Sequence, residues 1–204
     1  MLELIRYPSG QHSRKSSTSS RRSSNKKVQY GSRGMSLEGR INESNRYYLS
    51  KKIAVIHKKP TPIQVVRVDY PRRSAAKITE AYYRHASTTD YNGVYKGFYI
   101  DFEAKETTNK TSFPLQNLPS HQRIHMKQCL EQGGIAFVLF SFKVHQEIFL
   151  LPYEHLDEYL ATTQTKSIPY DFIKQYGYRC PISAFPMIDY LKALDCYLDD
   201  YNNK

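Results

Sequence analysis

The chain has 204 residues, 40% of them apolar, and a formal net charge of +11 at pH 7. This length suits one domain with an ordinary hydrophobic core and argues against two full domains. A small protein this basic most often binds a polyanion, and nucleic acid is the first candidate. A generally basic surface is the alternative.

The cysteines and the hydropathy of the chain bear on its compartment. Three cysteines, odd in number and widely spaced, favour reduced thiols over a disulfide framework: Cys129, Cys180 and Cys196. No apolar run reaches the roughly 18 residues of a membrane span. Residues 1–10 lack the pattern of a secretory signal. We therefore expect a cytoplasmic protein with no membrane partner.

Residues 1–32 are basic and rich in serine, with few side chains to bury. Burial in such a segment cannot offset the entropy lost on ordering, so a flexible arm is predicted. The arm is either a solvated tail or a cationic tether that binds phosphates in a salt-dependent way.

A helix is predicted over residues 37–49, because apolar side chains recur there at roughly helical spacing and Ser36 can cap the first turn. Glu38 falls in that turn, where a carboxylate suits the helix dipole, so a structural role is credible.

The block over residues 58–84 mixes cations, prolines and β-branched runs. Strands are expected over residues 53–56 and 63–68, on either side of Pro60 and Pro62. Because no clear apolar face emerges, the block indicates either a protruding basic element or a charged edge hairpin.

The stretch over residues 87–106 carries the clearest chemical pattern. Side chains alternate across a β-strand, which here separates an apolar set from a polar set. These sets are Ile100, Phe102 and Ala104 on one face, and Asp101, Glu103 and Lys105 on the other. The turn dipeptides Asn92-Gly93 and Lys96-Gly97 would fold the chain back and carry Asp90 to the same end of the strand as Glu103.

This polar set suits phosphodiester hydrolysis. Asp90 and Glu103 would supply carboxylates to Mg²⁺, which prefers oxygen ligands, and the Ala104 carbonyl could add another. Lys105 could position the attacking water or stabilise the developing charge. The alternative is a charged, solvent-facing strand edge without chemistry.

The second half of the chain predicts further strands and helices. Residues 107–119 are expected to form a polar loop, after which Ser120 caps a helix over residues 121–132. Two strands and three helices should follow, over residues 135–140, 147–151, 153–160, 169–175 and 186–201. Their order predicts an α/β domain with a central sheet and surrounding helices.

Other catalytic centres receive little support. His121 and His125 stand four residues apart on a predicted helix, a spacing that can hold zinc. The glutamate of a zinc peptidase is absent between them and no third ligand is evident, so zinc is not expected. Serine and cysteine nucleophiles lack a convincing histidine partner.

Several longer motifs occur in order along the chain. They are Arg33-Gly34-Met35, residues 53–62, Pro71-Arg72-Arg73-Ser74, residues 87–93, 99–107 and 109–115, and His121-Gln122. With these motifs the chain closely resembles the bacterial RecU family of Holliday junction resolvases, within the PD-(D/E)xK nuclease superfamily. The resemblance extends from Arg6 to about Tyr190.

The resemblance implies a restriction-endonuclease-like α/β core over residues 33–204, with a mixed sheet flanked by helices. A protruding stalk over about residues 58–84 would enter the centre of a four-way DNA junction. The family forms homodimers that nick two strands symmetrically in homologous recombination, DNA repair and chromosome segregation. It further implies a nucleoid-associated location and contacts with the RecA recombinase and a branch-migration helicase.

Residue roles follow from matching the motifs. The implied metal ligands are Thr88, Asp90, Glu103 and Gln122, for Mg²⁺ with Mn²⁺ as a substitute. Asp90, Asp101, Glu103 and Lys105 form the implied catalytic set, in which Lys105 stabilises the transition state. The expected DNA-binding residues are Arg33, Lys58, Lys59, Arg72 and Arg73, and Arg33 and Arg73 also match positions tied to RecA modulation. Thr89 stands where the superfamily has a proline, as is usual for the RecU branch.

Two other functions stay open. A restriction-type nuclease with the same core would cut linear duplex at a defined site. A non-catalytic protein would bind junctions, or regulate a recombinase, without cutting.

Overall fold

The computed structural model describes residues 34–72, 75–84 and 88–203, so the predicted arm over residues 1–32 lies outside the described residues. The elements follow this order: α1 (Leu37–Ser50), β1 (Ala54–Lys58), β2 (Ile63–Asp69), β3 (Lys77–Tyr83), β4 (Tyr91–Tyr95), β5 (Phe98–Thr107), β6 (Ser112–Pro114), the 3₁₀ helix η2 (Leu115–Asn117), α2 (Ser120–Glu131), β7 (Ile135–Phe142), β8 (Glu147–Pro152), α3 (Tyr153–Thr162), β9 (Ser167–Pro169), α4 (Tyr170–Tyr176), β10 (Tyr178–Arg179) and α5 (Tyr190–Asn202). Within these ranges, no helix combines the length and apolar character needed to cross a membrane.

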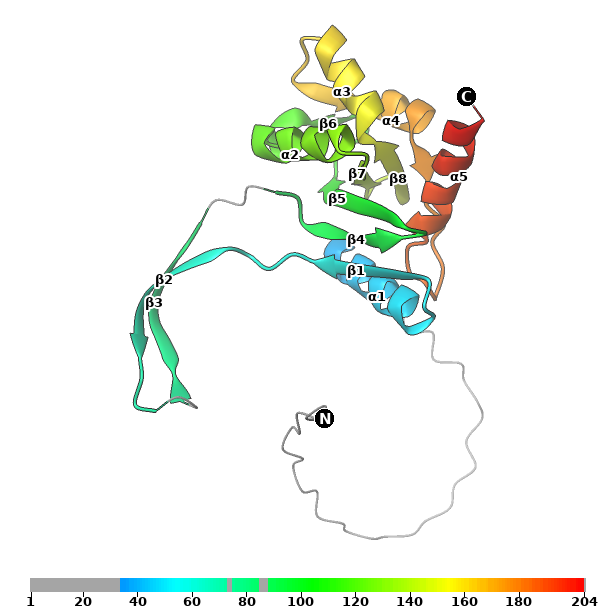
Figure 1. Ribbon diagram of the computed structural model, residues 1–204. Helices are drawn as coiled ribbons and strands as arrows, with labels where there is room; N and C mark the ends of the chain where they lie inside the picture. Colours follow the sequence, from blue (N-terminus) through cyan, green and yellow to red (C-terminus); the bar gives the residue numbers. More distant parts are fainter. Residues whose placement is uncertain (1–33, 73–74, 85–87, 204) are drawn as a thin grey trace, which may run out of the picture. The chain divides into compact units, whose positions relative to one another are not determined.

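Six strands form the central sheet in the order β1-β4-β5-β7-β8-β10 (Figure 1). β5 and β7 run parallel, with Ile100 opposite Ile135, and the other neighbouring pairs are antiparallel. The parallel pair requires a crossover, which α2 provides between the two strands. The predicted mixed α/β sheet with flanking helices is confirmed.

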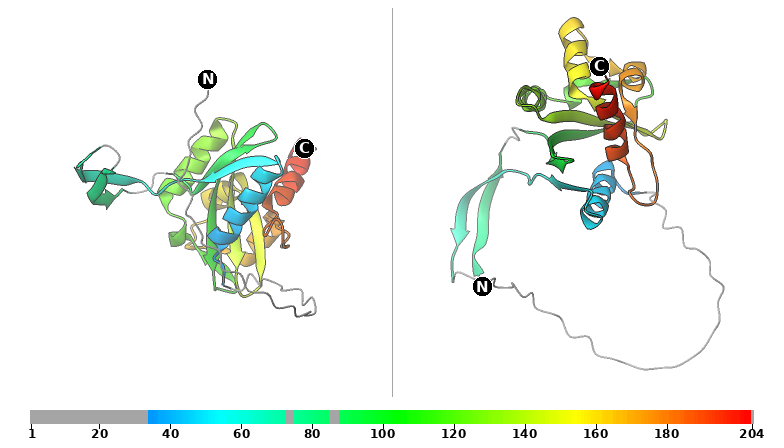
Figure 2. Two further views of the ribbon diagram at one scale, coloured as in Figure 1. Left: turned by 90° about the horizontal axis from the view of Figure 1, so that it is seen from below. Right: turned by 45° about the vertical axis from the view of Figure 1, so that its right-hand side comes forward.

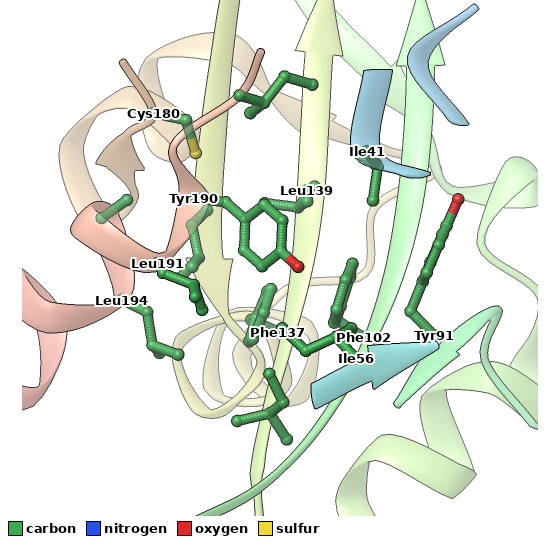
Figure 3. Packing of buried hydrophobic residues seen from close by; sticks show 14 of the residues in the cluster. Ile41, Ile56, Tyr91, Phe102, Phe137, Leu139, Cys180, Tyr190, Leu191 and Leu194 are labelled. Carbon is green, nitrogen blue, oxygen red and sulfur yellow. The ribbon is translucent and has the colours of Figure 1, made fainter. Parts of the chain in front are cut away.

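Two hydrophobic cores lie on opposite faces of this sheet, because alternate side chains of β7 enter each of them. Phe137 and Leu139 pack with α1 and α5 in the first core, where Phe102 stacks between Tyr91 and Phe137 (Figure 3). Val138 and Phe140 enter the second core, with residues of α2, α3 and α4. In both views of Figure 2, β2 and β3 extend away from the sheet and from the helices that surround it.

The polar face of β5 is buried, not solvent-facing. Ile100 and Phe102 belong to the first core. Asp101 and Glu103 alternate with them along the strand and so point to the opposite face, where α2 lies against β5 and β7. Asp101 is 0% exposed and Glu103 is 1% exposed. β5 also lies inside the sheet, between β4 and β7. The alternative of a charged strand edge is therefore wrong.

Of the two predicted turns, one is confirmed and the other is part of a strand. Lys96 and Gly97 form the two-residue turn between β4 and β5, with φ angles of 50° and 85°, as a type I′ hairpin requires. Asn92 and Gly93 are instead residues of β4, paired with β1. Gly93 is required there for space: a Cβ would lie 2.1 Å from the carbonyl oxygen of Val55.

Replacing Gly93 by alanine is expected to destabilise the protein by about 3 kcal/mol, because rigid strand backbone must shift to admit the methyl group. The added Cβ would also lie 2.7 Å from the Cα of Ile56. Thermal and chemical unfolding measure the change. Val94→Ala, at an exposed position of the same strand, is the control and should have little effect. Equal stability of both variants would contradict this account.

Other predicted boundaries need correction. Ser120 is the first residue of α2, and the preceding Pro119 makes no side-chain cap. Residues 107–119 are not simply a loop, since β6 pairs with β9 and buries Phe113. α5 begins at Tyr190 rather than at residue 186, because Asp189 caps it by accepting a hydrogen bond from the N–H of Lys192 at 3.4 Å.

β2 and β3 form a separate antiparallel hairpin within the predicted stalk (Figure 1). Nearly every residue of both strands is solvent-exposed, including Val66 at 53% and Tyr83 at 84%. A register shift at Arg67 interrupts the pairing, which increases local twist. The hairpin thus contributes no side chain to either core.

Candidate functional site

Asp90, Glu103 and Lys105 meet at the start of β4, as the sequence predicts for these three residues. The N–H of Asp90 donates a hydrogen bond to Oε2 of Glu103 at 3.0 Å. Nζ of Lys105 lies 3.0 Å from Oε1 of the same carboxylate. The β4–β5 hairpin makes this contact possible, because it pairs Tyr91 with Phe102 and so places Asp90 beside Glu103.

Burial makes the carboxylate of Glu103 hard to ionise. Its pKa is raised to about 7, mainly because of burial and further because of the nearby charge of Asp90, while Lys105 acts in the opposite direction. Two neighbouring acids with one ammonium leave unbalanced negative charge. A divalent cation would supply the missing positive charge, so the electrostatics fit a metal centre.

Tyr91 shows that a third carboxylate belongs to this region. Its buried hydroxyl has no hydrogen-bond partner among the described residues. Burial raises the pKa of the phenol, and the charges of Glu38, Asp90 and Glu103 raise it further. Sequence reasoning missed Glu38 because its place in the first turn of α1 already had a structural explanation. No spacing signal links it to the remote β4–β5 hairpin.

A cavity of about 360 Å³ opens beside these carboxylates. Its lining includes Glu38, Thr88 and Asp90, and the segment over residues 58–62 that leads from β1 to the β2–β3 hairpin. The implied ligand Thr88 is half-buried at its edge. The cavity thus leaves room for a ligand beside Glu38 and Asp90.

Gln122, the remaining implied ligand, has an unpaired oxygen. It lies on α2, the helix packed against β5, and its side chain is buried. Its Oε1 has no hydrogen-bond partner among the described residues. A buried amide oxygen without a donor is unfavourable unless another group binds it. The amide oxygen of Gln122, on the helix that covers β5, is thus available to a cation, and amide, hydroxyl and carboxylate oxygens are all ligands that Mg²⁺ accepts.

Asp101 has a different environment from Glu103. Its Oδ2 lies 2.7 Å from Nζ of Lys59, 2.7 Å from the hydroxyl of Tyr99 and 3.2 Å from Nε2 of His125. Its Oδ1 accepts a hydrogen bond from Thr89. Donors from the chain itself therefore surround Asp101, and it connects the loop before β4 to the helix α2.

Lys59 points inward, although the sequence suggests a DNA contact. Its side chain is 18% exposed, and its Nζ donates to Oγ1 of Thr89 at 3.0 Å as well as to Asp101. Its backbone N–H donates to the carbonyl of Asp90 at 2.7 Å. Lys59 is thus bonded to Thr89 and Asp90, in the segment just before β4, and to Asp101 on β5.

The other expected DNA-binding residues are placed differently. Lys58 forms an ion pair with Glu38 at the rim of the cavity. Arg72 is exposed beyond the end of β2. Arg33 and Arg73 lie outside the described residues.

Comparisons with known proteins give one consistent family. The family model described as "RecU: Recombination protein U" matches residues 32–196. The chain is 60% identical over 171 residues to the Holliday junction resolvase RecU of Streptococcus mutans serotype c, covering 83% of this chain and 87% of that protein. It is 51% identical over 197 residues to the protein of the same name from Staphylococcus aureus, covering 94% and 95%.

A solved structure is also similar, at 10% sequence identity. It is Hjc, a Holliday junction resolvase from Archaeoglobus fulgidus, with a TM-score of 0.37 over 63% of this chain and 84% of that one. The family match spans most of the chain, and both relatives are matched along most of their length. The chain belongs to the Recombination protein U (RecU) family.

Proposed function

We propose that this protein is a Holliday junction resolvase, a metal-dependent endonuclease that cuts four-way DNA junctions. The observation that carries the proposal is the bonded cluster of Asp90, Glu103 and Lys105 in a chain of the RecU family. Glu103 is paired with the ammonium of Lys105, and the charge of Asp90 lies near enough to raise the pKa of Glu103. Two neighbouring carboxylates and an ammonium would provide metal binding and charge stabilisation beside one reacting phosphate.

Each residue of the site has a separate task. Asp90 and Glu103, with the oxygens of Thr88 and Gln122, would hold Mg²⁺, or Mn²⁺ in its place. When bound, such an ion supplies a water of lowered pKa and positive charge for the phosphate. Lys105 directs its ammonium to the same place, where negative charge grows during hydrolysis. We infer that the cut leaves a 5′-phosphate and a 3′-hydroxyl.

The hairpin β2–β3 is proposed to read the shape of the junction. Among the described residues, four exposed cations lie on it or beside it: Arg67, Arg72, Lys77 and Arg84. Cations of this kind neutralise phosphates without reading the base sequence. Exposed apolar side chains such as Tyr83 and Val66 suit contact with unpaired or splayed bases at a junction centre.

Symmetric cutting is proposed to come from a homodimer. A four-way junction has two-fold symmetry, and a two-fold dimer would present identical sites to two opposed strands. We further propose that the basic residues 1–32 tether DNA, that RecA and a branch-migration helicase are partners, and that the enzyme acts on the nucleoid in recombination, repair and chromosome segregation. These proposals rest on the family and on the net charge of +11.

The decisive experiment incubates the full chain with a mobile four-way junction and, separately, with linear duplex of the same sequence. With Mg²⁺ or Mn²⁺ we expect paired nicks in the junction and an intact duplex. Cutting of the duplex at a defined site would favour a restriction-type nuclease. Binding of the junction without nicks in either metal would favour a non-catalytic binding protein.

Replacing residues 63–83 by a short glycine-serine link is expected to weaken junction binding at least about tenfold, because the link removes cations and the shape-reading element together. The six-stranded sheet should remain, since β2 and β3 pair with each other and not with it. Gel-shift titrations measure the affinity, and thermal unfolding tests the fold.

A charge-only variant separates the two contributions of the hairpin. Arg67→Gln with Lys77→Gln keeps the two strands and should weaken binding mainly at low salt. The deletion should in addition abolish the preference for junction over duplex. If the deletion variant kept that preference, the hairpin would not read the junction.

A further inference from the structure

Three metal-ligating side chains converge beside the proposed magnesium site. Asp101 of β5, and His125 and Cys129 of α2, offer ligand atoms that all lie within 4.8 Å of one another. His125 and Cys129 stand four residues apart, so one face of α2 presents both. The carboxylate of Asp101 lies opposite them, because α2 covers this face of β5.

Two of the three distances between ligand atoms in this cluster match those of a tetrahedral zinc site, and the third, between Asp101 and Cys129, is within 4.8 Å. Nε2 of His125 lies 3.2 Å from Oδ2 of Asp101 and 3.6 Å from Sγ of Cys129. Zinc bonds to nitrogen, oxygen and sulfur at tetrahedral angles would place these atom pairs about 3.4 Å and about 3.6 Å apart. The three side chains thus need little rearrangement to surround one ion.

We propose that Asp101, His125 and Cys129 form a binding site for Zn²⁺, separate from the magnesium site and open to water at the fourth position. Imidazole and thiolate select a softer ion than Mg²⁺, which prefers oxygen ligands. The cluster that contains His125 is completed by Asp101 and Cys129, and His121 is not a member of it. Cys129 and His125 are partly exposed, so an ion can reach them from solvent.

Lys59 is the group that zinc must replace. Its ammonium lies 2.7 Å from Oδ2 of Asp101 and 3.5 Å from Nε2 of His125, and so holds a positive charge at the edge of the cluster. On binding, the ion forms bonds to Asp101, His125 and Cys129, the thiol proton passes to solvent, and the ammonium withdraws from Asp101.

This exchange would reach the catalytic loop. The ammonium of Lys59 also donates to Thr89, and its backbone N–H donates to the carbonyl of Asp90. Withdrawal of the side chain removes one of the bonds that position Thr88, Thr89 and Asp90. Zinc at this site therefore inhibits junction cutting, a consequence that rests on the proposed function, whereas zinc binding does not.

The binding test uses Co²⁺ as a spectroscopic substitute for Zn²⁺, on the full chain in excess Mg²⁺. We expect a thiolate-to-cobalt absorption band that saturates at one ion per chain and disappears on addition of Zn²⁺. Cys129→Ser and Cys129→Ala should lose the band, whereas Cys196→Ser, a substitution of an exposed cysteine, should keep it. Wild-type protein without the band, or a Cys129 variant that keeps it, would overturn the site.

Two further measurements test the exchange and its effect. Lys59→Met, which removes the competing ammonium, should bind Co²⁺ more tightly, and unchanged affinity would refute the exchange. Micromolar Zn²⁺ should slow junction cutting by wild-type protein at least about tenfold, whereas Cys129→Ser should resist. Equal inhibition of both proteins would refute the inhibitory role. A chain that binds Co²⁺ through Cys129 but never cuts junctions would refute the proposed function and leave the zinc site standing.

Discussion

Replacing Glu103 by glutamine is expected to lower junction cleavage at least about 10²-fold while leaving junction binding intact. Glutamine keeps the size of the side chain and one oxygen, but it removes the charge that Lys105 and a metal ion require. Binding should persist, because the cations of the hairpin are untouched. Single-turnover cleavage and gel-shift titration of the same preparation measure the two properties.

Glu106→Gln is the matched control, because the same chemical change occurs three residues later on β5. Glu106 forms an ion pair with Lys143 at 2.7 Å and takes no part in the bonds that join Asp90, Glu103 and Lys105. This variant should cut junctions at the wild-type rate. If both variants lost activity equally, or neither did, the assignment of Glu103 would be wrong.

The Glu103→Gln variant should also be more stable than wild type in the absence of metal at high pH. The pKa of Glu103 is raised to about 7, so its ionisation lowers the stability of the folded state as the pH rises from the usual carboxyl range through 7. Glutamine has no such ionisation. Unfolding midpoints at pH 5 and pH 8 in a chelator should diverge between the two proteins, and equal pH dependence would contradict the burial of a charged carboxylate.

Replacing Lys59 by methionine is expected to reduce the free energy of unfolding by about 3 kcal/mol, because the fully buried carboxylate of Asp101 loses its cation. The same change should lower the affinity for Mg²⁺ about 10- to 100-fold, so that cleavage requires a higher Mg²⁺ concentration. Loss of a hydrogen bond that supports metal ligands has an effect of this size. Unfolding curves and Mg²⁺ titrations of the cleavage rate measure these effects separately.

Lys58→Met provides the neighbouring control. Lys58 pairs with Glu38 at the surface, with a side chain that is 39% exposed, so its loss should change stability by less than about 1 kcal/mol. Combining Lys59→Met with Asp101→Asn removes both charges and should recover part of the lost stability. Lys59→Met as stable as Lys58→Met would mean that the buried pair does not support the loop.

The alternation of side chains along β5 could be predicted because a strand has a strict period of two. It correctly separated the core-facing Phe102 from the site-facing Glu103, and the turn at Lys96-Gly97 correctly brought Asp90 back. The burial of Asp101 could not be predicted, because it depends on the packing of α2 against the polar face of β5. A connection of more than ten residues separates α2 from β5, so no local pattern indicates which face the helix covers.

Residues outside the motifs were the hardest to find. Glu38 comes from α1, and no local pattern distinguishes a carboxylate near the site from one that complements a helix dipole. No motif in the sequence marks Cys129 as a ligand, because its neighbours in the proposed zinc site are His125, one helical turn away, and Asp101, on the strand that α2 covers. Asn92-Gly93 has the composition of a turn, yet tertiary packing against β1 places it inside a strand.

The parallel pairing of β5 with β7 has a consequence for synthesis of the chain. Asp90 and Glu103 meet through a local hairpin, but α2, the helix that carries Gln122, packs against both β5 and β7, so it docks fully only when β7 is present. Contacts between distant segments form late, because a longer loop must first be closed. On the ribosome, the nascent chain can therefore bring Asp90 to Glu103 before α2 covers this face of the sheet, and the complete proposed site forms only after β7, which ends at Phe142, has emerged.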